Sequence, residues 1–471
     1  MALAPPNELI STQNALKRTA MAWASGARID MTDTRKLRHR AAKLCHTHYH
    51  AGIPLYRKAC QRANVHGTPD IDTILDELLL PDDIFKSYPN ELLDLRDFDG
   101  MNAWVSSIST AELDFCTDGL ETIDEWLAAV AEHGIRLVFS SGTSGHLSFV
   151  PRDDATWGAL TELPFLYLPY ALAERGMLPA WKSALLKLAP GRIEPSRFAG
   201  LVQRYGLRAT DGFFFAFSGG NQGIQLAGQE LGKLTRKSHY LYPRDISAAA
   251  VRSIVRGPKS AAETSLVQEF LDTTIGDKNA NYERLLRALS DCARTGRRVM
   301  LFGTPALLLE ACDAVRRSGL TLKLPKGSGI SYGGGWKSFT GERLPEEELL
   351  TMLEHTFGVP RAALSESYSM TEINAVMPKC AHARYHIPPF LETAIFDEAL
   401  VRKHGEDQVG ILGVIDPFAT SYPGFLLTGD NVSLTHRSCP CGLQGPQILE
   451  IARSPGKEVK GCGGIMAAVN A

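Results

Sequence analysis

The chain has 471 residues, which is long enough for a large core and for two or three packed units. Apolar residues make up 44% and charged residues 22%, a composition typical of soluble globular proteins. The formal net charge of −2 creates no global field toward nucleic acid or a membrane surface, so any phosphate binding must be local.

Two further features bear on the cell compartment. The N-terminus lacks the features of a signal peptide, and no stretch approaches the ~18 apolar residues of a membrane span. Nine cysteines are too sparse for a disulfide scaffold, so reduced thiols are the simpler interpretation. We therefore expect a cytoplasmic protein that partners with neither nucleic acid nor a membrane.

Residues 1–130 are expected to form a mainly helical N-terminal region. Residues 34–63 combine Arg, Lys and His with apolar residues at helical spacing. Residues 70–80 and 122–131 repeat this amphipathic pattern.

Residues 131–390 have a different pattern, in which short apolar runs lead into glycine-containing turns. Residues 135–139 enter SSGTSG, residues 299–302 enter GTPALLLEACDAV, and residues 330–332 enter GGGWK, with a helical pattern soon after at 344–357. Strands alternating with helices predict an α/β fold with a mainly parallel sheet. In such sheets ligands bind beyond the carboxyl ends of the strands, where these turns lie.

The last part of the chain predicts a smaller β subdomain over residues 391–453. Three short strand-like segments, ETAIFDE, VGILGVIDP and GFLLTGDNVSLTH, are separated by turns. Residues 454–471 then form a short tail.

The turn SSGTSG at residues 140–145 has the composition of a phosphate-binding loop. Its glycines let the backbone approach an anion closely, and its hydroxyl and amide groups can surround the anion's oxygens. The GK[ST] ending of a Walker A loop is absent, which argues against a P-loop kinase. A surface turn of small residues is the alternative interpretation.

Two polar motifs follow later in the chain. YSMTE, residues 368–372, offers an aromatic ring, a hydroxyl and a carboxylate, which suit a base, a phosphate and a cation such as Mg²⁺. In LTGD, the Asp430 carboxylate could accept hydrogen bonds from two ribose hydroxyls. The alternatives are a helix start for YSMTE and an ordinary turn for LTGD.

The order of these motifs carries more information than any one of them. SSGTSG, GTPALLL, YGGGW, YSMTE, TGD and the arginine of Ala452-Arg453 resemble, over residues 135–453, the adenylate-forming (acyl-AMP) synthetase superfamily. The resemblance implies that superfamily's large-domain fold, with mainly parallel sheets, flanking helices and a small β subdomain closing the nucleotide site. It also implies ATP-dependent activation of a carboxylic acid as acyl-AMP, with release of pyrophosphate.

The same resemblance implies roles for individual residues. Thr371 would contact phosphate and Glu372 would ligate Mg²⁺. The other nucleotide-binding residues would be Ser141, Gly142, Thr143, Ser144 and Gly145 at the phosphates, Gly333, Gly334 and Gly335 along the adenine and acyl groups, Tyr368 near the adenine, and Asp430 and Arg453 at the ribose.

Two departures from the superfamily pattern matter. The Gly-x-Pro-Lys continuation of the loop is missing after Gly145, so Arg152 or Lys337 is expected to supply positive charge. The lid domain that the resemblance implies is absent or vestigial, together with its adenylation-promoting lysine. This departure disfavours thioester formation with CoA by the usual domain rotation.

The short ending is similar to that of the LuxE-like acyl-protein synthetases, as are GGGWK and YSMTE. That branch transfers the acyl group from AMP to a cysteine near the C-terminus, and the matching residue here is Cys462. Lys457 and Lys460 lie close enough in sequence to lower the pKa of such a thiol. An ordinary tail thiol is the alternative.

A second constellation predicts a structural zinc site. Cys439 and Cys441 form a Cys-x-Cys pair, and Cys380 and His386 lie upstream, with His382 as a competing ligand. Phenylacetate–CoA ligase-like members of the superfamily have a similar arrangement. The alternative is four unconnected residues.

The acceptor of the acyl group stays open at this point. Candidates are Cys462, CoA, the phosphopantetheine of an acyl carrier protein, a downstream acyl-accepting enzyme, and an amine. The runner-up enzyme is an aryl- or acyl-CoA ligase of the phenylacetate type. A different class of protein would be a non-catalytic nucleotide-binding or zinc-stabilised scaffold.

Overall fold

The computed structural model describes residues 3–140, 145–335 and 344–453. Up to residue 132 these residues are mostly helical, and local signals explain where helices begin. Asp30 caps α2 by accepting from the backbone N–H groups of Thr32 and Asp33, and Thr122 and Glu125 form a capping box at α7. The elements are α1 (Asn7–Ala24), α2 (Met31–Gly52), α3 (Pro54–Arg62), α4 (Ile71–Glu77), β1 (Leu80–Pro81), η1 (Asp82–Lys86), α5 (Asn90–Asp94), α6 (Phe98–Ile108) and α7 (Ile123–Glu132).

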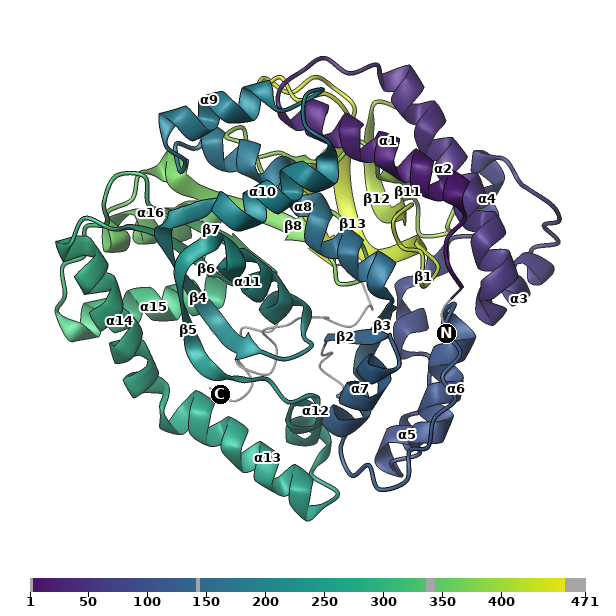
Figure 1. Ribbon diagram of the computed structural model, residues 1–471, viewed down its shortest axis with the longest axis horizontal. Coiled ribbons are helices and arrows are strands. Elements are labelled where there is room, and N and C mark those ends of the chain that lie inside the picture. Colours follow the sequence, from purple (N-terminus) through teal and green to yellow (C-terminus); the bar gives the residue numbers. More distant parts are fainter. Residues whose placement is uncertain (1–2, 141–144, 336–343, 454–471) are drawn as a thin grey trace.

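A six-stranded sheet, in the left half of the view in Figure 1, has the strand order β5-β4-β6-β7-β8-β9. The first five strands are parallel, and β9 adds to the edge in the antiparallel direction. Their bounds are β4 (Leu207–Gly219), β5 (Thr235–Asp245), β6 (Arg298–Gly303), β7 (Gly329–Gly333), β8 (Leu364–Ser369) and β9 (Val376–Pro378). The runs at residues 299–302 and 330–332 lie in β6 and β7, as predicted.

Helices cover both faces of this sheet (Figure 1). α11 connects β4 to β5 in one direction along the sheet, whereas α14, α15 and α16 belong to connections that run in the other direction. Right-handed crossovers therefore place α11 on one face and the other three on the opposite face. The helices are α8 (Asp154–Glu174), α9 (Ala180–Leu188), α10 (Pro195–Tyr205), α11 (Gly223–Leu234), α12 (Ala248–Arg256), α13 (Ala261–Leu271), η2 (Asp272–Gly276), α14 (Lys278–Arg294), α15 (Pro305–Ser318), α16 (Glu346–Phe357) and η3 (Arg361–Ala363).

One strand prediction needs correction. The run at residues 135–139 does form a strand, β2 (Arg136–Ser140), but this strand does not join the parallel sheet. It pairs in the antiparallel direction with β3 (Ser148–Arg152) as a separate two-stranded sheet. Apolar runs specify that a strand is buried but not which strand it pairs with, so the sequence pattern could not separate these arrangements.

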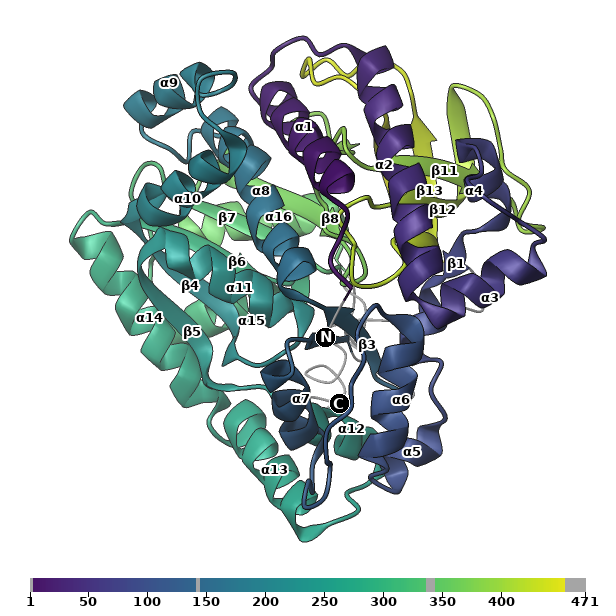
Figure 2. The same ribbon diagram turned by 45° about the vertical axis from the view of Figure 1, so that its right-hand side comes forward.

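A second six-stranded sheet contains the C-terminal strands (Figure 2). Two short strands from outside residues 391–453 join it: β10 (Tyr385–His386) pairs with β14, and β1 pairs with β13. Helices α1 and α2 pack beside it (Figure 2). The remaining strands are β11 (Glu392–Phe396), β12 (Asp407–Ile415), β13 (Phe425–Thr435) and β14 (Gln447–Arg453). Within the described ranges, no helix has the length and apolar character needed to cross a bilayer.

Candidate functional site

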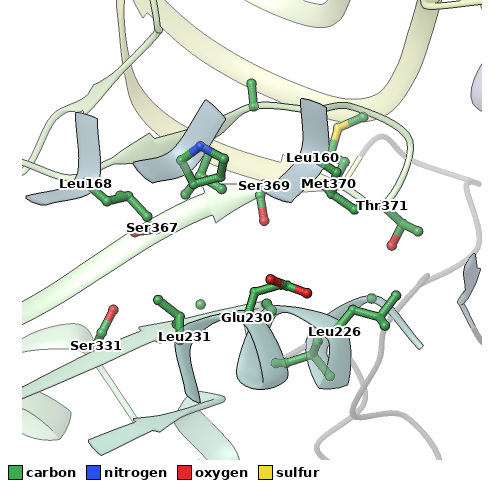
Figure 3. Close-up of a pocket in the computed structure, with 18 of the residues that line it drawn as sticks. Leu160, Leu168, Leu226, Glu230, Leu231, Ser331, Ser367, Ser369, Met370 and Thr371 are labelled. Atoms are coloured by element: carbon green, nitrogen blue, oxygen red, sulfur yellow. The ribbon is translucent and has the colours of Figure 1, made fainter. Parts of the chain in front are cut away.

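A cavity of about 250 Å³ lies at the carboxyl ends of β6, β7 and β8 (Figure 3). Thr304, Gly333 and Ser369 line it at or just beyond these strand ends, and α8 and α11 supply much of the rest of the wall. Its lining is of two kinds: aliphatic side chains from the two helices, and a polar group that includes Asp82, Glu372 and Arg453. The cavity is therefore at the edge of the sheet where parallel α/β folds bind ligands.

Asp430 lies in this pocket at the centre of a hydrogen-bonded group. One carboxylate oxygen accepts from the Tyr368 hydroxyl at 2.6 Å, and the other accepts from Nη1 of Arg453 at 2.6 Å. The antiparallel pairing of β13 with β14 sets Asp430 directly opposite Arg453. Three residues predicted from separate parts of the chain thus meet in one place, and the Asp430 carboxylate has a fixed orientation.

Nearby acidic side chains stabilise the positive charge of Arg453. Burial tends to lower the pKa of this guanidinium, but Asp430, with smaller contributions from Asp82 and Glu372, raises it overall. Asp82, Glu372 and Asp430 thus bring three carboxylates beside this guanidinium in one part of the pocket. Carboxylate oxygens suit binding of a divalent cation or of hydroxyl donors.

Asp82 is a residue of this pocket that the sequence analysis missed. The two residues of β1 pair in parallel with Leu426 and Leu427 of β13, which brings the following Asp82 beside Gly429 and Asp430 of the same strand. Its side chain is buried. A two-residue strand leaves no periodic signal, so only the Pro-Asp-Asp sequence at the start of η1 could have drawn attention to it.

The YSMTE motif is split between a strand and the turn that follows it. Tyr368 ends up buried in β8, whereas Thr371 and Glu372 lie in the turn after β8 and line the pocket. Glu372 is buried, and its backbone carbonyl accepts from the Tyr422 hydroxyl at 3.0 Å. The hydrogen bond from Tyr422 therefore anchors the turn, and Thr371 and Glu372 line the cavity.

Arg152 supports the same turn through hydrogen bonds. Its guanidinium is fully buried; one nitrogen donates to the carbonyl of Thr371 at 2.7 Å and the other donates to the Asn374 side chain. Arg152 was expected, as an alternative to Lys337, to substitute for the missing loop lysine, but it is not among the described residues that line the pocket. Because its donors are directed at the protein backbone and at Asn374, this residue positions the turn.

The glycine-rich end of β7 allows a close approach of backbones. A Cβ atom on Gly333 would lie 2.9 Å from the carbonyl oxygen of Ser367, and Gly334 and Gly335 have φ angles of +81° and +61°. Both features favour glycine at this edge of the pocket. Gly333 and Gly334 line the cavity, while Gly335 is exposed beyond it.

Several predicted residues lie outside the described ranges: Ser141, Gly142, Thr143, Ser144, Lys337 and Cys462. Gly145, the last residue of the predicted phosphate loop, is described and has a φ of +70°. A side chain there would also meet Arg256 at 2.8 Å. The roles assigned to this group from the sequence therefore stay predictions.

A second cluster, of Cys380, His386, Cys439 and Cys441, is brought together as predicted. The four ligand atoms lie within 4.8 Å of one another, with 3.7 Å between the sulfurs of Cys380 and Cys439 and 3.2 Å between Cys441 Sγ and His386 Nε2. A tetrahedron with Zn–S bonds of about 2.3 Å has sulfur–sulfur edges of about 3.8 Å. The donor set and its dimensions therefore fit zinc.

Local structure explains how these four residues meet. Cys380 begins a tight turn after β9, His386 lies in β10 opposite Gln447 of β14, and the Cys-x-Cys pair occupies the turn between β13 and β14. Burial raises the pKa of Cys380 and of Cys441 and lowers the pKa of His386 to about 4. His382, the competing ligand, is exposed and donates only its backbone N–H to the sulfur of Cys380.

A family model and two curated proteins each match less than half of the chain. Residues 266–469 match the family model described as "Acyl-protein synthetase, LuxE". The "Long-chain-fatty-acid--luciferin-component ligase" of Aliivibrio fischeri is 23% identical over 208 residues, which are 44% of this chain and 55% of that protein. The protein of the same name from Vibrio harveyi is 25% identical over 169 residues, 35% of this chain and 45% of that protein. The match thus spans about half the length of these curated relatives.

A solved structure of similar fold covers most of the chain. The 2-hydroxyisobutyryl-CoA ligase in the postadenylation state, in complex with 2-HIB-AMP, is 13% identical, with a TM-score of 0.50. The alignment covers 89% of this chain and 67% of that one. At this identity the likeness shows the fold alone. The chain is thus similar to the LuxE acyl-protein synthetases over residues 266–469, and most of it shares the fold of the 2-hydroxyisobutyryl-CoA ligase.

Proposed function

We propose that this protein uses ATP to convert a carboxylic acid to acyl-AMP, and then transfers the acyl group to a thiol. The observation that carries the proposal is that one pocket is lined both by an aliphatic wall and by Asp430 and Arg453, with the buried Tyr368 bonded to Asp430. An acyl chain and a nucleotide are both bound in acyl-AMP formation. A protein that binds only a nucleotide would not need an aliphatic wall beside these polar residues.

In this reaction the residues mainly position and stabilise the reactants. Asp430 would accept hydrogen bonds from the ribose, with Arg453 beside it, and residues 141–145 would bind phosphate. A carboxylate oxygen of the acid attacks the α-phosphorus, the bond to the bridging oxygen breaks, and pyrophosphate leaves with the electron pair. Magnesium held by Glu372 would supply positive charge to the departing group.

The test is ATP–pyrophosphate exchange with Mg²⁺ across fatty, aromatic and amino-substituted acids. Exchange that depends on one class of acid would support adenylation and identify the type of substrate. The curated relatives are named for a long-chain fatty acid, and the leucines of α8 and α11 make an aliphatic acyl group the first choice here. ATP binding without exchange with any acid would instead favour the scaffold alternative.

We expect the acyl group to pass to Cys462, whose thiolate would attack the acyl carbonyl and release AMP. A radiolabelled acid should then remain on the protein and be released by hydroxylamine, and Cys462→Ser should remove this label. Cys116→Ser is the matched control, because Cys116 is an exposed thiol outside the pocket lining. Label on the Cys462→Ser protein would contradict this step. Release of AMP only with CoA, or with a carrier protein, would instead support the alternative acceptors.

We also propose that Cys380, His386, Cys439 and Cys441 hold a structural Zn²⁺. With four protein ligands, no position is left open for catalysis, and the ion would fasten the β9–β10 segment to the turn between β13 and β14. The cysteines in the described ranges are free thiols, which suits a reducing, cytoplasmic location.

His386→Ala is expected to lower the zinc content from about one ion per chain and to lower the melting temperature, because a structural zinc ion contributes to folding stability. Zinc is measured by elemental analysis and stability by thermal unfolding, with and without a chelator. His382→Ala should leave both quantities close to those of the wild type. Equal zinc loss in the two variants would mean that the ligand set is wrong.

A further inference from the structure

Glu230 is a carboxylate in the pocket that the proposed reaction does not use. It lies on α11 among the aliphatic residues that this helix turns toward the cavity. Figure 3 shows its carboxylate directed into the space between α11 and β8, toward Ser369. Among the residues that α8 and α11 contribute to the lining, Glu230 is the one acidic side chain. Its neighbours on the lining face of α11 are Ile224, Leu226, Ala227, Leu231 and Leu234.

The partner of Glu230 lies mostly in solvent. Lys233 contacts Oε1 at 2.5 Å, but the Lys233 side chain is 61% exposed and the Glu230 side chain only 15%. Within the described residues, Oε2 accepts no hydrogen bond. An exposed lysine one turn away contributes little to binding energy. The carboxylate can therefore exchange this lysine for a cation inside the pocket.

The opposite wall is lined with hydroxyl groups. Ser365, Ser367 and Ser369 occupy alternate positions of β8, so their side chains point to the same side, and Ser331 on β7 lies next to Ser365. The hydrogen bonds among the described residues include none from these four hydroxyls. A purely aliphatic ligand would displace water from the hydroxyls and from Glu230. It could not replace the hydrogen bonds that the water makes, so its binding free energy would be less favourable.

We propose that the acid substrate carries an ammonium group on its acyl chain, which Glu230 binds while the serines of β7 and β8 bind the groups around it. This inference rests on the proposed function and narrows its substrate class to aliphatic amino acids. A charge-assisted hydrogen bond between ammonium and carboxylate is stronger than a neutral one, and the aliphatic wall would pack against the methylene groups.

The experiment compares linear ω-amino acids with methyl-terminated acids of equal chain length, over a series of lengths, in ATP–pyrophosphate exchange. The wild type should have the higher kcat/KM for the amino acid at one length or a few adjacent lengths. Glu230→Gln should lower that value by about tenfold to a hundredfold. For the methyl-terminated acid the same variant should keep or raise kcat/KM, because a buried charge is lost.

Lys233→Gln is the matched control, since it removes the ion pair but leaves the pocket carboxylate in place. It should keep the preference for the amino acid. The inference is overturned if the wild type prefers the methyl-terminated acid at every length and Glu230→Gln leaves the ratio unchanged. Absence of exchange with every acid would instead count against the proposed function. In that case, calorimetric binding of the two acids to wild type and Glu230→Gln would still decide the role of Glu230.

Discussion

Replacing Asp430 with alanine is expected to lower kcat/KM for ATP in pyrophosphate exchange by on the order of a hundredfold or more. The substitution removes the carboxylate that would accept the ribose hydroxyls. It also removes the acceptor that orients Tyr368 and Arg453, both of which lie 2.6 Å from it. The expected change is measured from initial exchange rates at varied ATP concentration.

Two further variants show whether the effect comes from the carboxylate itself. Tyr368→Phe keeps the carboxylate but removes one donor to it. The kcat/KM for ATP should therefore fall less, by about tenfold. Asp407→Ala removes an acid on the neighbouring strand β12 that bonds to Thr435 and is half exposed, and it should leave exchange close to the wild-type rate. Wild-type kinetics in Asp430→Ala would exclude this residue from nucleotide binding.

The parts of the site that could be predicted are those whose residues lie close together in the sequence. YSMTE brings its own geometry, because the end of β8 and the turn after it place neighbouring residues at the same edge of the sheet. LTGD lies within β13, where Asp430 faces Arg453 across the ladder. The Cys/His cluster was predictable for a related reason: its four ligands come as two short pairs, and each pair lies on one local turn or hairpin. Within each motif or pair little depends on long-range packing, although strand pairing between distant segments brings the motifs and the pairs together.

The parts that could not be predicted depend on contacts between distant segments. Helix α8 is apolar on all sides and contains Pro164 and Pro169, so it has no amphipathic period and its prolines argue against a helix. Asp82 reaches the pocket only through the pairing of β1 with β13. Arg152 has no sequence signal for burial, because arginine is rarely fully buried. Packing against the rest of the chain decides each of these positions.

Arg152→Met is expected to lower the free energy of unfolding by about 1–3 kcal/mol for each buried acceptor that loses its donor, here the Thr371 carbonyl and the Asn374 side chain. Burial raises the pKa of Asp416, and N–H donors from Asn374 and Phe418, together with the more distant charge of Arg152, act against that rise. Methionine would also remove this charge. The change is measured by denaturant unfolding at neutral pH.

Arg402→Met is the matched control. Arg402 pairs with Asp72 and Asp76, whose side chains are 63% and 43% exposed, so its loss should cost less than about 1 kcal/mol. Together with Asp430→Ala, the two variants separate the support of the site from its chemistry. Asp430→Ala should lose exchange that stabilising conditions do not restore, whereas Arg152→Met should lose stability, and its remaining exchange should recover under conditions that stabilise the fold. If Arg152→Met is as stable as the wild type but inactive, Arg152 acts on the nucleotide and not on the turn that carries Thr371 and Glu372.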